Sequence, residues 1–302
     1  MASIQSQITK FFLRLTSQKG KGYKKDIIRL RQKMEASTIV YNLPEGVRVE
    51  PISAGGVSAE WVIPKQAASD CVIYYLHGGG YCFGSCNSHR PMVACLAAAA
   101  GIRVLHISYR LAPEHPFPAA VEDCLTVYQW LLSEGVLPQS IVMGGESAGG
   151  MFTLTTLLQA RECGLAMPAA AFCLSPYTDF TFQNKSIKQY EKQELFFSYK
   201  DLQQIAKLYV GEQNTYNPLI SPIYADLRGL PPLLIHVADP EILLDDALSL
   251  AARARQAEVE VELKVWKNMF HAFQLFSFLP ESKKAMQEVV AFARQKLLLP
   301  LD

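Results

Sequence analysis

Short runs of β-branched and apolar residues alternate with longer helical patterns along most of this chain. The runs predict eight strands, over Val47–Ile52, Val57–Ile63, Cys71–Leu76, Arg103–Ile107, Ile141–Gly144, Ala170–Leu174, Leu233–Val237 and Val259–Trp266. From the third strand onward helical patterns separate most of them, over Pro91–Ala100, Ala119–Glu134, Gly149–Cys163 and Asp245–Gln256. Strands and helices that alternate in this way form right-handed crossovers and a mostly parallel sheet with helices on both faces. The pattern predicts an α/β fold with an eight-stranded sheet, whose first two strands pair as an antiparallel hairpin around Ala54-Gly55-Gly56.

Charge and cysteine content narrow the classes of function. The 302 residues include 29 Lys and Arg and 28 Asp and Glu, a formal net charge of +1. Neither nucleic acid nor an anionic membrane is therefore favoured as a partner. The seven cysteines lack the spacing of a metal site, which predicts no bound metal and free thiols in a reducing compartment.

Two stretches lie outside the alternating pattern. Residues 1–42 predict two helices joined at Gly20–Gly22, and residues 176–230 contain no good strand but one helical pattern, Leu202–Tyr209. Long insertions in compact α/β proteins are usually functional. We therefore predict N-terminal cap helices over 1–42, a catalytic domain over 43–302 and a second cap or lid segment over 176–230. The alternative is a peripheral helix pair with no role in substrate choice.

The first predicted helix is amphipathic. Its apolar residues recur at roughly helical spacing: Ile4, Ile8, Phe11, Phe12 and Leu15. Gln7, Lys10 and Arg14 interrupt them, so no apolar stretch is long enough for a signal peptide or a membrane span. We expect a cytoplasmic protein without stable membrane insertion, whose first helix packs on its own domain. A surface-bound amphipathic helix is the alternative.

A serine lies on a sharp turn between a predicted strand and a predicted helix. The sequence Gly145-Glu146-Ser147-Ala148-Gly149 fits G-x-S-x-G, follows the strand Ile141–Gly144 and opens the next helical pattern. Such an elbow holds the serine in strained backbone angles and presents its hydroxyl at the carboxyl edge of the sheet. The helix N-terminus behind it supplies free N–H groups and a positive dipole. The context predicts that Ser147 is a nucleophile.

Three consecutive glycines follow the strand that ends at Leu76. In His77-Gly78-Gly79-Gly80 they allow backbone N–H groups to approach a ligand oxygen closely. This is the lipase and esterase type of oxyanion loop, whose donors act together with the N–H of the residue after the nucleophile. We predict oxyanion donors at Gly79, Gly80 and Ala148. His77 is expected to hold the loop by hydrogen bonds rather than to act as the base.

The base is predicted from chain order. His271 follows the last strand, where the order serine, acid, histidine places it. The remaining histidines fit less well, because they lie in apolar strands, beside a proline or near the oxyanion loop: His77, His89, His106, His115 and His236.

The acid is open between two residues. Asp239, Glu241, Asp245 and Asp246 all follow the strand Leu233–Val237, where an orienting carboxylate belongs. Asp245 and Asp246 begin an apolar helical pattern and can be explained by its dipole. Asp239 and Glu241 remain.

Four segments together resemble the bacterial esterases of the hormone-sensitive lipase family. They are His77-Gly-Gly-Gly-Tyr81, Tyr109-Arg-Leu-Ala-Pro-Glu-His-Pro-Phe-Pro118, Gly144-Gly-Glu-Ser-Ala-Gly-Gly150 and His271-Ala-Phe. The resemblance spans the chain from about Val72 to its C-terminus. It implies the α/β-hydrolase fold, carboxylesterase activity on small to medium acyl esters, no cofactor and an N-terminal cap.

The resemblance also bears on two single positions. The family commonly has Asp where Glu146 stands, a change expected to matter little. Its acid usually lies about 30 residues before the histidine, which favours Glu241 over Asp239, although Asp239-Pro240 matches the first two residues of the family's usual acid motif, Asp-Pro-Leu. We predict the triad Ser147, Glu241 and His271, with Asp239 as the alternative acid.

The predicted function is a serine carboxylesterase that hydrolyses short- to medium-chain acyl esters. An amidase or acyltransferase with the same triad is a second hypothesis, and a non-catalytic small-molecule receptor of this fold is a third. Six aromatic residues could line the pocket or belong to the core: Tyr81, Phe83, Tyr177, Phe180, Phe196 and Phe197. The predicted last strand, Val259–Trp266, would be a sheet edge through which a homodimer could form.

Overall fold

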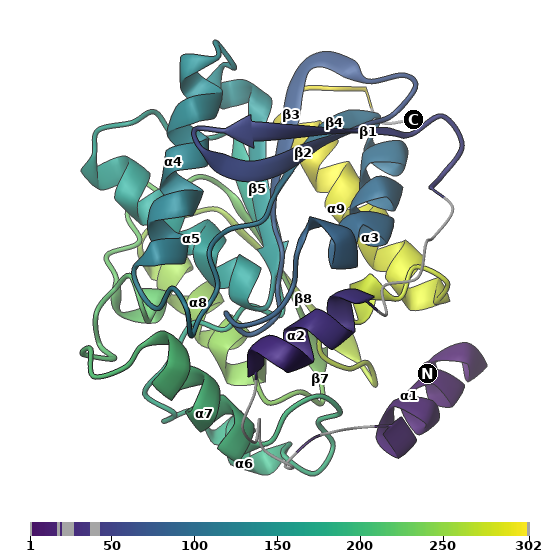
Figure 1. The fold of residues 1–302 in the computed structure, drawn as a ribbon, viewed down its shortest axis with the longest axis vertical. Coiled ribbons are helices and arrows are strands. Elements are labelled where there is room, and N and C mark those ends of the chain that lie inside the picture. Colours follow the sequence, from purple (N-terminus) through teal and green to yellow (C-terminus); the bar gives the residue numbers. More distant parts are fainter. Residues whose placement is uncertain (1, 17–18, 20–26, 37–42, 301–302) are drawn as a thin grey trace.

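The chain folds around one eight-stranded sheet in a computed structural model, which describes residues 2–16, 19, 27–36 and 43–300 (Figure 1). The strands are β1 (Arg48–Ala54), β2 (Val57–Ile63), β3 (Ala68–Leu76), β4 (Ile102–Ile107), β5 (Ile141–Glu146), β6 (Ala170–Leu174), β7 (Leu233–Asp239) and β8 (Val261–Lys267). Their order in the sheet is β1-β2-β4-β3-β5-β6-β7-β8. β2 is antiparallel to both β1 and β4, and the other pairs are parallel. The predicted mostly parallel sheet with an N-terminal hairpin is confirmed.

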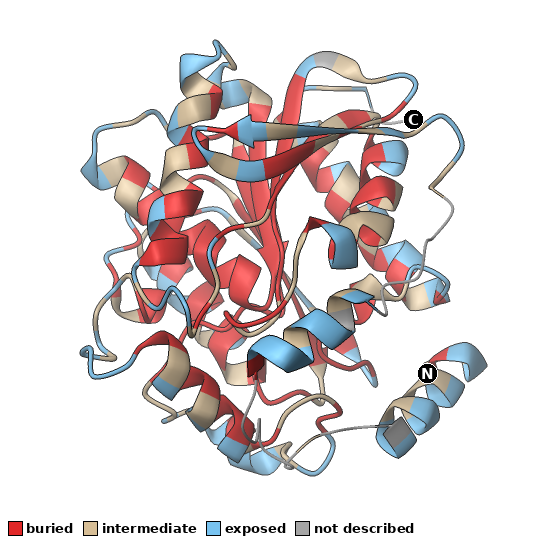
Figure 2. Cartoon of the chain, in the orientation of Figure 1, coloured by how far each residue is buried: buried red, intermediate tan, exposed pale blue. Residues whose placement is uncertain are grey.

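Helices cover both faces of the sheet (Figure 1). The described helices are α1 (Ile4–Thr16), α2 (Ile27–Ala36), α3 (Cys86–Ala100), α4 (Ala119–Ser133), α5 (Ala148–Glu162), α6 (Lys185–Gln189), α7 (Tyr199–Tyr209), α8 (Leu244–Gln256) and α9 (Pro280–Lys296). Helices α4, α5 and α8 pack on one face, and α3 and α9 pack on the other. Period-two alternation in the strands explains this division: Tyr74 and Met143 point to the first face, whereas Tyr75 and Val142 point to the second. The central strands are buried on both sides (Figure 2).

The largest differences from the predicted helices are in α3 and α9. α3 begins at Cys86 instead of Pro91, because Ser85 forms a capping box with Ser88 and Pro91 is accommodated inside the helix. α9 was not predicted, yet Val289, Phe292 and Ala293 on it belong to the core on the α3 face of the sheet. The last strand, β8, begins two residues later than predicted and lies at the edge of the sheet, as expected.

The two segments outside the alternating pattern are helical where they are described. Residues 1–42 contain α1 and α2, and the expected joint at Gly20–Gly22 lies outside the described residues. Residues 176–230 contain α6 and α7 and no strand among their described positions. None of the helices in the described ranges is long and apolar enough to cross a lipid bilayer.

Candidate active site

The predicted site residues all follow strands that end at the same edge of the sheet. The oxyanion loop follows β3, Ser147 follows β5, Glu241 follows β7 and His271 follows β8. Since β3 neighbours β5 and β7 neighbours β8 in a parallel arrangement, their carboxyl ends lie together. The sheet therefore brings segments nearly 200 residues apart in the sequence to one edge.

Ser147 has the backbone of a nucleophile elbow. Its φ of 55° and ψ of −117° lie in the positive-φ region that costs free energy for a residue with a side chain. The Ser147 N–H donates to the Leu174 carbonyl at 2.8 Å, which fixes the turn between β5 and α5. A Cβ atom on Gly145 or Gly149 would lie 2.2 or 1.9 Å from the Leu76 carbonyl oxygen, so the turn closes only with glycine there.

The buried carboxylate beside His271 belongs to Glu241. Glu241 Oε1 lies 3.6 Å from His271 Nδ1, and the two side chains are almost fully buried. Glu241 Oε2 accepts hydrogen bonds from the Ser175 hydroxyl at 2.8 Å and the Ala238 N–H at 3.1 Å. These bonds aim the other oxygen at the imidazole.

The alternative acid, Asp239, is placed differently. It is the last residue of β7, its side chain is partly exposed, and its backbone carbonyl accepts the Asn268 N–H. Among the carboxylates in the described part of the chain, Glu241 is the one within 4.0 Å of a His271 ring nitrogen. The geometry therefore favours Glu241 as the partner of the imidazole.

His271 is held in an environment that favours its protonated form. Burial opposes charge on the ring, but Glu241, followed by Glu194 and Glu146, raises the pKa of His271 above its ordinary value. The nearby carboxylates therefore stabilise an imidazolium that the buried site would otherwise disfavour.

A segment between α6 and α7 also reaches His271. The Phe197 and Phe196 rings meet the imidazole edge-on, with ring centroids 4.9 and 6.3 Å away. Glu194 Oε1 accepts the N–H groups of Leu195 and Phe196 at 2.8 and 3.0 Å, and burial raises the pKa of its carboxyl group. Neither a motif nor periodicity in the sequence pointed to Glu194.

The other aromatic residues that could line the pocket lie either in the core or beside His271. Tyr81, Tyr177 and Phe180 are almost fully buried; Tyr81 stacks on Tyr209, Tyr177 stacks on Phe180, and Tyr81 contacts Tyr177 and Phe180 at a tilt. They belong to the first core, whereas Phe196 and Phe197 lie beside His271.

Glu146 anchors the first glycine of the oxyanion loop. Its carboxylate accepts the Gly78 N–H and the Tyr75 hydroxyl, and it lies 2.8 Å from His89 Nε2. Although burial opposes ionisation, His89, Tyr75 and the Gly78 N–H hold the pKa of Glu146 below its ordinary value. This network was not predicted, since position 146 was expected to matter little.

The two predicted loop donors remain available. Gly79 and Gly80 have positive φ values of 120° and 57°, and in the described structure their N–H groups donate no hydrogen bond. A Cβ atom on Gly79 would lie 2.2 Å from the Phe83 carbonyl oxygen, so this turn requires glycine. Ala148 is the first residue of α5, where backbone N–H groups lack a partner within the helix. The three N–H groups can thus serve a ligand oxygen.

His77 holds the base of this loop. It is completely buried, its Nδ1 lies 2.7 Å from the Gly78 carbonyl oxygen, and its own carbonyl accepts the Tyr109 hydroxyl at 2.6 Å. Its ring stacks on Tyr109 with centroids 4.2 Å apart. Burial lowers the pKa of His77 well below its ordinary value, so it is a neutral packing residue.

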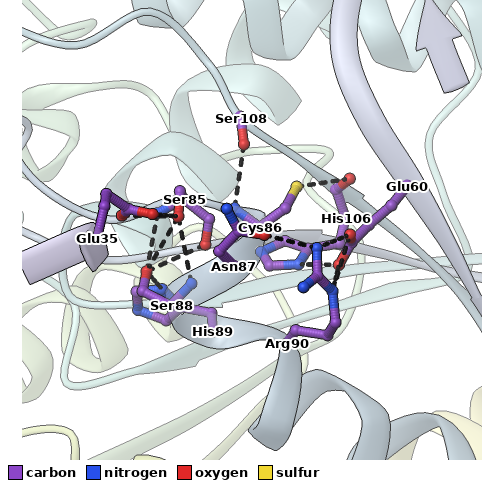
Figure 3. Close-up of polar contacts among 10 residues, drawn as sticks. All are labelled: Glu35, Glu60, Ser85, Cys86, Asn87, Ser88, His89, Arg90, His106 and Ser108. Atoms are coloured by element: carbon purple, nitrogen blue, oxygen red, sulfur yellow. Dashed lines mark hydrogen bonds and ion pairs between the residues drawn. The ribbon is translucent and has the colours of Figure 1, made fainter. Parts of the chain in front are cut away.

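Helix α2 binds the chain just after the glycines of the oxyanion loop, at Cys82. Arg31 donates to the Cys82 carbonyl at 2.7 Å and the Ala112 carbonyl at 2.6 Å, and it pairs with Glu114 at 2.7 Å. Glu35 accepts the hydroxyl of Ser85, which caps α3, at 2.8 and 2.9 Å (Figure 3). Helix α2 thereby contacts the segment that follows the predicted oxyanion donors.

One group of buried side chains in the described residues has the composition of a metal site. Ligand atoms of Glu60, Cys86 and His106 all lie within 4.8 Å of one another (Figure 3). Arg90 already pairs with Glu60 at 2.6 Å, and its charge occupies the position next to the carboxylate that a cation would need. Burial lowers the pKa of His106, but Cys86 and Glu60 outweigh it and raise the value to about 9. The group is a buried charge network that secures the start of α3.

Asp245 and Asp246 connect α8 to the segment 176–230. Asp246 is fully buried and accepts the N–H groups of Thr178 and Asp179 at 2.7 and 2.9 Å, and Asp245 accepts the Ser186 N–H at 2.9 Å. Burial raises the pKa of Asp246 to about 7. Their explanation as charges on the helix dipole was therefore incomplete.

The elbow, the oxyanion loop and the acid–histidine pair at one sheet edge define an α/β-hydrolase. A family model described as alpha/beta hydrolase fold matches residues 73–275. An esterase from Acinetobacter venetianus is 36% identical over 249 residues, which cover 82% of each protein. An acetyl-hydrolase from Streptomyces hygroscopicus is 39% identical over 244 residues, or 80% of this chain and 81% of that protein.

Solved structures give the same result at higher coverage. An esterase from the bacterial hormone-sensitive lipase family is 40% identical, with a TM-score of 0.92 over 98% of this chain and 100% of that chain. EstE5, in a crystal soaked with p-nitrophenyl butyrate, is 38% identical, with a TM-score of 0.93 and the same coverage. The chain belongs to the bacterial hormone-sensitive lipase family within the α/β-hydrolase fold, as the sequence resemblance predicted.

Proposed function

We propose that this carboxylic ester hydrolase forms an acyl-enzyme on Ser147, with His271 as general base and Glu241 as the carboxylate that orients it. Membership of the family, whose relatives include an esterase and an acetyl-hydrolase, makes the protein a serine carboxylesterase. The proposed roles rest on one distance: Glu241 Oε1 lies 3.6 Å from His271 Nδ1. This pair is at the same edge of the sheet as the turn that carries Ser147. Converging nucleophile, base and orienting acid is the arrangement that acyl transfer requires.

The proposed cycle uses each group once per half-reaction. His271 takes the hydroxyl proton as Ser147 Oγ attacks the ester carbonyl, and Glu241 stabilises the resulting imidazolium. The N–H groups of Gly79, Gly80 and Ala148 would hold the oxyanion, and such a donor contributes on the order of 3 kcal/mol in the transition state. The imidazolium then protonates the leaving alcohol, and water repeats the steps on the acyl-enzyme.

The acid limb of the pH profile tests the role of His271. The base accepts a proton only when neutral, so kcat/KM should fall as pH decreases through the pKa of His271 in the free enzyme. Because neighbouring carboxylates raise this pKa, we expect the midpoint above the ordinary value of 6.5. Glu194→Gln removes one such carboxylate and should move the midpoint to lower pH. Initial rates on a neutral ester across pH would measure both; a limb below 6.5 that Glu194→Gln leaves unmoved contradicts the assignment.

We also propose that residues 1–42 and 176–230 form a cap over the catalytic domain of 43–302. Contacts from both segments support this division. Phe196 and Phe197 from the second segment lie against His271, and Arg31 from the first binds the backbone of the oxyanion-loop region. The cap would exclude water from the acyl-enzyme until the alcohol has left.

The proposed substrates are short- to medium-chain acyl esters. In support, one similar protein carries the name acetyl-hydrolase, and crystals of EstE5 were soaked with p-nitrophenyl butyrate. The Phe196 and Phe197 rings, which contact the His271 imidazole, would suit a small apolar acyl group. An amidase or acyltransferase would use the same groups, and a non-catalytic receptor would not need the buried His271–Glu241 pair.

A substrate series separates these functions. Across p-nitrophenyl esters of increasing acyl length, we expect kcat/KM to be greatest for short to medium chains and to fall for long ones, because the cap limits the acyl site. The matched p-nitroanilide should react at least about 10³-fold more slowly, since its amine is the poorer leaving group. Comparable rates on the anilide would favour an amidase, and faster alcoholysis than hydrolysis would favour an acyltransferase.

We propose a cytoplasmic location and a homodimer that forms through the last strand. The seven cysteines are all free thiols, which supports a reducing compartment such as the cytoplasm. β8 lies at the edge of the sheet and could pair with a second copy.

A further inference from the structure

Helix α1 packs on the protein through its polar side. Ser6 is fully buried, and its hydroxyl donates to Glu281 at 2.6 Å. The Ser3 hydroxyl donates to the same carboxylate at 2.9 Å, and Lys10 Nζ donates to the Asn268 carbonyl at 2.7 Å. The helix is thus anchored at the start of α9 and after β8 by hydrogen bonds. The expectation that the first helix packs on its own domain holds. The side that packs carries Ser6, Lys10 and the partly buried Leu13, and the row of exposed apolar residues is not part of it.

The apolar side of α1 faces solvent. Ile4, Ile8, Phe11 and Leu15 recur at i, i+4, i+7 and i+11, which places them on one stripe of the helix opposite Ser6. They are 73, 52, 58 and 66% exposed, and α1 is mainly pale blue in Figure 2. Such a contiguous row is unusual on a protein surface and marks an interaction site.

The charge of this region indicates what the stripe contacts. The first 34 residues contain nine Lys and Arg and one acidic residue, Asp26, whereas residues 35–302 contain 20 basic and 27 acidic residues. The net charge of +1 therefore conceals a strongly basic N-terminal segment on an acidic remainder. On α1 itself there is no acidic residue, and Arg14 lies beside the apolar stripe, whereas Lys10 is on the side that faces the protein.

We propose that α1 is an interfacial anchor that binds an anionic lipid surface. The apolar stripe would enter the boundary between headgroups and acyl chains, and the basic residues would contact the headgroups. A second copy is the less suitable occupant, because a symmetric contact between α1 helices would bring two basic segments together. This proposal does not depend on the catalytic roles given above.

Vesicle binding tests the anchor. The full-length protein is incubated with ether-linked vesicles, which an esterase cannot hydrolyse, of phosphatidylcholine alone or with phosphatidylglycerol at about 7:3, and bound protein is separated by flotation. We expect binding to the anionic vesicles, weak binding to the neutral ones, and loss of binding at about 0.5 M NaCl, where headgroup charge is screened. Phe11→Ser/Leu15→Ser removes half of the stripe, and Arg14→Glu reverses a charge; each should weaken the partition coefficient at least about tenfold.

Leu137→Ser is the matched control, because Leu137 is 56% exposed but lies just before the short helix that precedes β5. It should bind like the wild type, and circular dichroism and thermal unfolding should show that all variants are folded. The proposal is overturned if neither vesicle binds, if both bind equally, or if Leu137→Ser loses as much binding as the stripe variant. It is also overturned if light scattering finds a lipid-free dimer that Phe11→Ser/Leu15→Ser dissociates, which would make a second copy the occupant.

Discussion

Replacing Ser147 with alanine is expected to lower kcat for p-nitrophenyl acetate hydrolysis by about 10⁵- to 10⁶-fold, the loss typical of a missing serine nucleophile. Without Oγ no acyl-enzyme forms, and the remaining groups can only polarise the ester and orient water. The fold should not change, because Ala at the elbow adopts the same positive φ as Ser147 at similar cost and the fixing hydrogen bond comes from the backbone N–H.

Two measurements complete this test. A fluorophosphonate should label the wild type at Ser147 and leave Ser147→Ala unlabelled, which also separates an enzyme from an inert binding protein. Circular dichroism and thermal unfolding should match between the two proteins. Turnover close to that of the wild type in a folded Ser147→Ala protein would rule out Ser147 as the nucleophile.

Glu241→Gln is expected to lower kcat by about 10²- to 10⁴-fold, with a smaller effect on KM. The amide oxygen of Gln could still accept the hydrogen bond from the Ser175 hydroxyl. A neutral amide, however, could no longer stabilise an imidazolium and could hold His271 in the wrong tautomer. The carboxylate acts in the transition state, where the ring is charged, so the loss should fall mainly on kcat.

Asp239→Asn is the matched control for this acid. It changes a partly exposed carboxylate two residues away, and we expect it to reduce kcat by less than about tenfold because it leaves the oriented imidazole in place. The comparison uses steady-state kinetics on one ester, with unfolding temperatures as the folding control. A larger loss in Asp239→Asn than in Glu241→Gln would reverse the choice of acid.

The parts of the site that could be predicted are those that a short segment specifies. The elbow at Ser147 and the glycines after β3 follow from a strand, a turn and a helix adjacent in the sequence. Chain order then indicated His271, and the spacing known from the family favoured Glu241. Where the chain departs from local rules, as at Pro91 inside α3, the predicted boundary was wrong because the cap at Ser85, six residues earlier, decides the start of the helix.

The supporting residues could not be predicted in this way. Glu146 meets Gly78 across two neighbouring strands, Arg31 reaches Cys82 from a separate helix, and Glu194 comes to His271 from the segment 176–230. Each contact joins positions 51 to 77 residues apart, and no motif records such a pairing. Their roles depend on which elements the fold brings together.

The sequence by itself determined the sheet, the elbow and the family, because side-chain periodicity and turn chemistry act between neighbours in the chain. The family spacing favoured Glu241 over Asp239, but only the tertiary structure places the Glu241 carboxylate 3.6 Å from His271, since both acids follow the same strand and differ in where the turn points them. The tertiary structure also decided which side of α1 is buried. The same apolar stripe in a sequence can belong to a buried helix or to an exposed one. Here the stripe is exposed because Ser3 and Ser6, on the other side of the helix, bind Glu281 near the other end of the chain.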